Sequence, residues 1–217
     1  MTDDLAATAT ASPVAAGPDG ATRRELVRST VAAGAAAAVA SVVPSLGPST
    51  ALAAPVGDIA VLALALRAEQ VIVYAYERVL ASGIVASPAA RVLTLFLAQE
   101  HEHVDALTVN LVRLGGAVPS PPSDLAEFEV ELRELGVKRS PVGLRNERES
   151  VSFLVRLEMA VATVYHFVID QLADDKLIQT AAQIMANEGQ HAAVLHELVS
   201  PGNVRRAVPS AFVGGVK

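Results

Sequence analysis

Apolar residues recur at steps of three and four along four long stretches of the chain, which is the spacing of one helical face. In the first stretch the apolar positions are Leu62, Leu66, Ile72, Val73, Tyr76 and Leu80. We therefore predict four long helices, over residues 57–80, 87–114, 146–172 and 176–199. Regular alternation of β-branched residues, the mark of an all-β protein, is missing.

Turn residues separate these stretches and predict how the helices connect. Ser82-Gly83 and Asp174-Asp175 mark short turns, which pair the first helix with the second and the third with the fourth. The middle connection is long and Pro-rich, and Asp124 is placed to cap a short helix over 125–135. This order predicts an all-α four-helix bundle whose long crossover lets helices two and three run parallel.

The amino-terminal residues have the order of an export signal. Arg23-Arg24 precedes a weakly apolar run, Val31 to Val43, and Ala51-Leu52-Ala53 follows as a cleavage site. The arginine pair resembles a twin-arginine signal. We expect residues 1–53 to be signal peptide and disordered N-terminus, residues 54–200 the bundle, and residues 201–217 a loop tail. An uncleaved amino-terminal anchor is the alternative.

Composition narrows the classes of function. The chain is 52% hydrophobic with no Trp, which suits helices packed closely on helices. A net charge of −6 without a basic stripe argues against nucleic-acid binding. The absence of Cys excludes iron–sulfur clusters, rubredoxin-type sites and thiol nucleophiles.

Charged residues that lie in phase with the apolar stripes are the candidate functional residues. Glu69 lies three residues after Leu66 and four before Val73, and Glu158 lies four after Leu154 and three before Val161. Both carboxylates are therefore predicted to point into the bundle. A buried carboxylate costs several kcal/mol unless it is paired or bound to metal.

The second and fourth helices each carry a Glu-x-x-His motif, Glu100 with His103 and Glu188 with His191. Residues three apart lie on one helical face, one turn apart. Two such motifs and two single glutamates are the ligand set of carboxylate-bridged di-iron and di-manganese bundles. Their oxygen and imidazole ligands suit iron or manganese. We predict six metal ligands: Glu69, Glu100, His103, Glu158, Glu188 and His191.

The two halves of the chain repeat the pattern. Arg67-Ala-Glu69 with Tyr76 matches Arg156-Leu-Glu158 with Tyr165, and Ala98-Gln99-Glu100 matches Ala186-Asn187-Glu188. A repeat of 88 to 89 residues implies a pseudo-twofold axis through the site (188 − 100 and 158 − 69). Tyr76 and Tyr165 each follow an in-phase Glu by seven residues. Each tyrosine hydroxyl either donates a hydrogen bond to a metal-ligand side chain or takes part in redox chemistry beside the metals. The alternative is that both rings only pack in the core.

With these residues, residues 57–200 resemble the ferritin-like superfamily, in particular rubrerythrin-type proteins without a rubredoxin module. The resemblance implies two divalent metal ions, with iron favoured and manganese the alternative, that react with oxygen or peroxide. It implies an oxidoreductase that oxidises ferrous iron or consumes peroxide. Manganese catalase-like chemistry, a structural or stress-protective bundle with optional metal, and iron storage in a cage are the alternatives.

The expected partners follow from these interpretations. They are a small oxidant or ferrous iron, the twin-arginine export machinery, and no nucleic acid, while a homo-oligomer is left open. Export places the protein in the periplasm, the cell envelope or the extracellular space.

Overall fold

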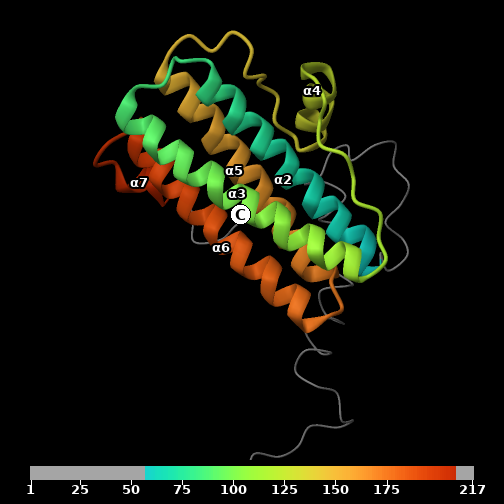
Figure 1. The fold of residues 1–217 in the computed structure, drawn as a ribbon. Helices are drawn as coiled ribbons and strands as arrows, with labels where there is room; N and C mark the ends of the chain where they lie inside the picture. Colours follow the sequence, from blue (N-terminus) through green and yellow to red (C-terminus); the bar gives the residue numbers. More distant parts are fainter. Residues whose placement is uncertain (1–56, 209–217) are drawn as a thin grey trace, which may run out of the picture. The chain divides into compact units, whose positions relative to one another are not determined.

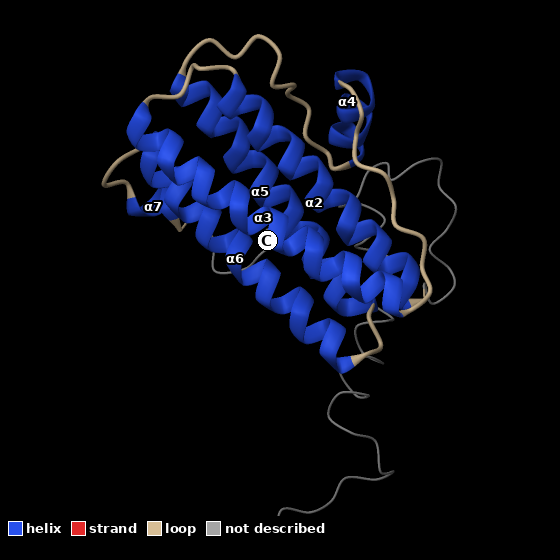
Figure 2. Cartoon of the chain, viewed as in Figure 1, coloured by secondary structure: helices blue, strands red, loops and turns tan. Residues whose placement is uncertain are grey.

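The structure, a computed structural model, describes residues 57–208, which form helices joined by loops (Figures 1 and 2). The described residues comprise four long helices and two short ones: α2 (Asp58–Ala81), α3 (Ser87–Arg113), α4 (Leu125–Glu134), α5 (Glu147–Gln171), α6 (Asp175–Val199) and α7 (Val204–Ala207). They contain no strand, so the predicted all-α helical bundle is confirmed. The predicted signal segment, residues 1–53, lies outside the described residues.

Capping side chains set where three of the predicted helices, α4, α5 and α6, begin. The carboxylate of Asp124 accepts a hydrogen bond from Glu127 N at 2.9 Å, and Asn146 Oδ1 accepts one from Glu149 N at 2.9 Å. Asp174 Oδ1 accepts from two backbone N–H groups at the start of α6. Each cap satisfies donors that lack a partner in the first helical turn. The helix boundaries therefore fall within one residue of the sequence prediction.

Contacts between helix ends define the topology. The backbone N–H of Ala86, just before α3, donates to Glu147 Oε2 at the start of α5 over 2.6 Å. At the other end, the carboxylate of Asp58 accepts from Ala173 N at 2.8 Å and Asp174 N at 3.2 Å. The starts of α3 and α5 therefore meet, and these two helices run in the same direction (Figure 1).

The connection between α3 and α5 contains α4 and lies against α2 (Figure 1). Tyr74 of α2 stacks on Phe128 of α4 with ring centroids 4.6 Å apart. Arg67 pairs with Glu131 of α4 at 2.7 Å on the surface of the bundle. Gln70 Nε2 donates to the carbonyl of Pro119 at 2.8 Å. Gly115 follows the end of α3 and Gly136 follows the end of α4. Both have a positive φ, 78° and 76°, the conformation that commonly terminates a helix.

Apolar side chains from all four long helices fill the core, with Leu66, Leu111, Leu154 and Leu195 fully buried. Two helices, α2 and α5, are also long and apolar enough to span a membrane by length and composition alone. In the bundle, 61% and 50% of their most apolar windows are buried. Burial against other helices therefore accounts for their apolarity.

One expectation is wrong in the carboxyl-terminal tail. Residues 201–217 were expected to be loop, but Val204–Ala207 form the short helix α7. Asn203 caps it by accepting a hydrogen bond from Arg206 N at 3.2 Å. A helix of four residues is too short to show apolar periodicity, so the pattern carries no signal for it. Residues 209–217 lie outside the described residues.

Burial along α3 predicts where truncation destabilises the bundle. Leu111 is fully buried and Leu95 is 57% exposed on the same helix. Leu111→Ala should lower the free energy of unfolding by about 2–5 kcal/mol because it leaves a cavity. Leu95→Ala should change it by less than about 0.5 kcal/mol. Chemical denaturation followed by circular dichroism measures both, and equal losses would contradict this packing.

Candidate metal centre

The six predicted ligand residues converge in the interior of the bundle. One comes from α2, two from α3, one from α5 and two from α6. Each is buried, and the most exposed of the six retains only 9% of its surface: Glu69, Glu100, His103, Glu158, Glu188 and His191. Helical phase explains the convergence, since each residue lies on the face of its helix that also carries the core leucines and valines.

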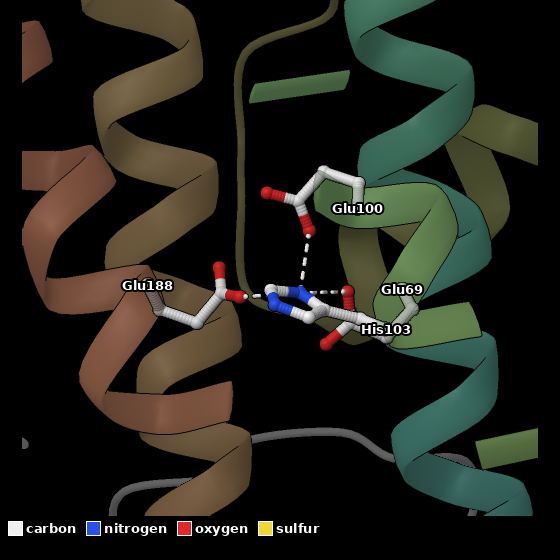
Figure 3. Close-up of side chains that lie close together, drawn as sticks. All are labelled: Glu69, Glu100, His103 and Glu188. Atoms are coloured by element: carbon white, nitrogen blue, oxygen red, sulfur yellow. Dashed lines mark hydrogen bonds and ion pairs between the residues drawn. The ribbon is translucent and has the colours of Figure 1, made fainter. Parts of the chain in front are cut away.

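His103 stands at the centre of the first half of the site (Figure 3). Its Nδ1 lies 3.1 Å from Glu100 Oε2, 3.1 Å from Glu188 Oε1 and 3.5 Å from Glu69 Oε2. Three helices therefore present carboxylate oxygens to one imidazole nitrogen. These four residues offer ligand atoms that all lie within 4.8 Å of one another.

His191 organises the second half in the same way. Its Nδ1 lies 2.8 Å from Glu100 Oε1 and 3.6 Å from Glu158 Oε1. Glu100, Glu158, Glu188 and His191 again offer ligand atoms within 4.8 Å of one another. Glu100 and Glu188 belong to both halves, and Glu100 presents one oxygen to each histidine. The arrangement is that of two adjoining sites that share two carboxylates.

Buried oxygen atoms without hydrogen-bond partners show that this cluster fits cations. In the described part of the chain, Glu69 Oε2, Glu100 Oε1, Glu158 Oε2 and both oxygens of Glu188 accept no hydrogen bond. His191 Nδ1 is close to Glu100 Oε1 but not aligned with it as a hydrogen bond. Unsatisfied buried carboxylate oxygens are costly, and a divalent metal ion would satisfy several at once. The donor set of oxygen and imidazole nitrogen suits iron or manganese.

The electrostatics of the cluster follow from its burial. Burial raises the pKa of Glu69 to about 8, and burial with the charges of three neighbouring glutamates raises that of Glu188 well above its usual range. Burial would also raise the pKa of Glu100, but the two histidines beside it lower it to about 2. Burial disfavours charged imidazoles, yet the carboxylates raise the pKa of His103 to about 10 and of His191 to about 9. Without metal, protons on Glu69, Glu188 and the two imidazoles offset part of the negative charge of the cluster.

The two tyrosines cross between the halves of the repeat. Tyr165 of α5 donates to Glu69 Oε1 of α2 at 2.5 Å, and Tyr76 of α2 donates to Glu158 Oε1 of α5. Both rings are fully buried. Burial and the adjacent carboxylates raise the pKa of both hydroxyls well above their usual range. Each hydroxyl therefore stays protonated and holds one oxygen of a glutamate that serves only one half of the site.

Neighbouring polar residues lie off the inner face. His101 and Glu102 are exposed on α3, as their phase predicts, and His101 lies 3.9 Å from Glu77. Arg156 and His166 are exposed on α5.

Sequence reasoning missed two residues that touch the site. Gln99 Oε1 lies 2.7 Å from His191 Nε2, and Phe96 stacks on the ring of His191 with centroids 4.1 Å apart. Both lie on α3, whereas His191 lies on α6. Gln99 belongs to the repeated pattern, but its position beside Glu100 does not indicate which neighbouring helix its side chain contacts.

The raised pKa values predict how pH affects the metal-free protein. Glu69, His103 and His191 bind protons more tightly in the folded state than in the unfolded chain, where their values are near 4.5 and 6.5. Their contribution to stability is present at lower pH and is lost as pH rises through about 8 to 10. Glu100 behaves in the opposite way, because its pKa is lower in the folded state. Its contribution to stability is present above pH 4.5 and is lost as pH falls toward about 2.

We therefore expect the melting temperature of chelator-treated protein to fall as pH rises from about 6 to about 9. Metal affinity should rise over the same interval, because metal ions displace these protons. Thermal unfolding followed by circular dichroism at several pH values tests this. A melting temperature that increases with pH in the metal-free protein would show that the cluster holds no such protons.

Comparison with known proteins agrees with this architecture. No curated protein sequence matches the chain. The fold is similar to that of a conserved hypothetical protein, rv2844, from Mycobacterium tuberculosis, with a TM-score of 0.56 and 18% sequence identity. That similarity covers 66% of this chain and 91% of the other. The family model of the ferritin-like domain matches residues 57–201. The chain therefore belongs to the ferritin-like domain family.

Proposed function

We propose that this protein binds two divalent metal ions, iron in preference to manganese, and uses them to oxidise ferrous iron or to consume peroxide or oxygen. The observation that carries the proposal is the set of four buried glutamates and two buried histidines that form two adjoining groups. We infer further that the centre is of the rubrerythrin type without a rubredoxin module, since the chain contains no cysteine.

The ligand residues divide between the two metal ions. Glu69 and His103 would hold one ion, and Glu158 and His191 the other. Glu100 and Glu188 would serve both, because they belong to both groups. Four carboxylates carry a charge of −4, which two divalent ions neutralise. This balance favours divalent ions over a single monovalent one.

When bound, a pair of iron or manganese ions supplies redox chemistry toward oxygen or peroxide. The protein's own residues would orient the ligand carboxylates and enclose the metal site. The tyrosine hydroxyls hold Glu69 and Glu158 in place from the opposite half of the repeat. Leu66, Leu107 and Leu195 are among the buried apolar residues of the surrounding core, which keeps bulk water away. We propose as a second role that Tyr76 and Tyr165 move a proton or an electron beside the centre.

Export belongs to the same proposal. Residues 1–53 carry the twin-arginine pattern, and that route transports folded cargo. A metal ion bound in the cytoplasm would therefore travel with the protein to the periplasm, the cell envelope or the outside. Electrons for turnover come from ferrous iron itself or from a separate protein, since the chain has no cysteine-ligated cluster.

Metal analysis of the native exported protein is the direct test. We expect about two iron or manganese ions per chain in the wild type. Glu100→Gln should lose both ions, because Glu100 faces both histidines. It should also abolish oxidation of ferrous iron and consumption of peroxide.

Two exposed neighbours provide matched controls. Glu102→Gln and His101→Ala lie on the same helix but outside the cluster, and both should retain metal and activity. Manganese with oxygen release from peroxide would favour catalase-like chemistry instead of iron oxidation. A wild-type protein that folds fully, carries no metal and shows no turnover would overturn the proposal in favour of a structural bundle.

The tyrosine hydrogen bonds predict a second outcome. Tyr165→Phe and Tyr76→Phe should each lower metal affinity about 10- to 100-fold, because each frees a ligand carboxylate to rotate. Tyr74→Phe is the control, since Tyr74 packs on Phe128 away from the cluster. Calorimetric titration of metal-free protein measures the affinities. Unchanged affinity with lost turnover would instead identify the tyrosines as redox participants.

A further inference from the structure

The two ligand histidines occupy unequal surroundings although the repeat makes them equivalent. The side chain of His191 is 1% exposed, whereas that of His103 is 11% exposed. The ring of His191 stacks on Phe96, and its Nε2 lies 2.7 Å from Gln99 Oε1. His103 Nε2 has no hydrogen-bond partner among residues 57–208. His191 is therefore held by Phe96 and Gln99 in addition to facing carboxylates through Nδ1, whereas within the described residues His103 is held through Nδ1 alone.

The Gln99 contact decides which nitrogen of His191 faces the carboxylates. An amide oxygen can only accept a hydrogen bond, so it selects the imidazole form with a proton on Nε2. Nδ1, which lies beside Glu100 and Glu158, is then the nitrogen that gives up its proton and offers its lone pair when a metal ion binds. An outer hydrogen bond of this kind orients a ligand histidine and makes it a better donor to metal.

We propose that Gln99 is a positioning residue for His191 and makes the metal site of Glu158 and His191 the tighter of two unequal sites. This inference rests on the proposed function, since it requires that the cluster bind metal. The site of Glu69 and His103 is then the weaker one, from which an ion exchanges more readily with solvent.

The internal repeat supplies an independent argument for this asymmetry. Asn187 occupies the position before Glu188 that Gln99 occupies before Glu100. The side chain of Asn187 is one methylene shorter and makes no hydrogen bond within the described residues. The repeat thus places an amide beside each motif, but only the longer one reaches the histidine of the other motif. One methylene group in the side chain, Gln99 against Asn187, therefore distinguishes the surroundings of the two histidines.

Titration of the metal-free full-length protein with Mn²⁺, followed by calorimetry, tests the proposal. The wild type should bind two ions with different affinities. Gln99→Met keeps the side chain's length but removes the acceptor, and it should weaken the tighter event about 10- to 100-fold while leaving the weaker one unchanged. Gln99→Glu restores an acceptor for Nε2–H and should keep the tighter event.

Asn187→Leu is the matched control at the equivalent repeat position, and it should leave both binding events unchanged. Circular dichroism checks that each variant is folded before titration. Equal weakening of both events in Gln99→Met, or no weakening of either, overturns the role of Gln99 while leaving the metal centre intact. A folded wild type that binds no Mn²⁺, Fe²⁺ or other divalent ion overturns the proposed function, and this inference with it.

Discussion

Four carboxylates share the interior of one helical bundle, and this concentration of like charge constrains much of the structure. Each would be costly to bury alone, by several kcal/mol. Two imidazoles, two tyrosine hydroxyls and bound protons offset the charge in the metal-free protein. The raised pKa of Glu69 and the lowered pKa of Glu100 are two sides of this balance. Metal ions would replace the protons on the same ligand groups.

The repeat arranges these compensating groups in pairs. Each tyrosine bonds to a glutamate of the other half, so the two halves are linked through the site as well as through the core. Loss of metal or of one glutamate would therefore affect both halves of the bundle, the α2–α3 pair and the α5–α6 pair. The same symmetry is broken around the histidines, where Phe96 and Gln99 enclose His191 but not His103. Two equivalent ligand sets thus sit in different environments.

The connection between α3 and α5 gives the bundle the topology on which the site depends. It lets the α2–α3 pair meet the α5–α6 pair so that α3 and α5 start at the same end, as the contact of Ala86 with Glu147 shows. Gln70 and Tyr74 attach this connection to α2, within the five residues that follow Glu69. Packing of α4 on α2 therefore supports the helix that positions one ligand.

The sequence by itself determined the four long helices and the six residues that face the interior. Helical period states which residues share a face, and an in-phase glutamate such as Glu69 stands out because burying it is costly. Period does not state which helix lies opposite, so only the tertiary structure decided that Tyr76 bonds Glu158 rather than a residue of its own half. Reach across helices likewise decided that Gln99 contacts His191, while the side chain of Asn187 makes no hydrogen bond within residues 57–208. The four-residue helix α7 escaped prediction because it is shorter than the period that reveals helices.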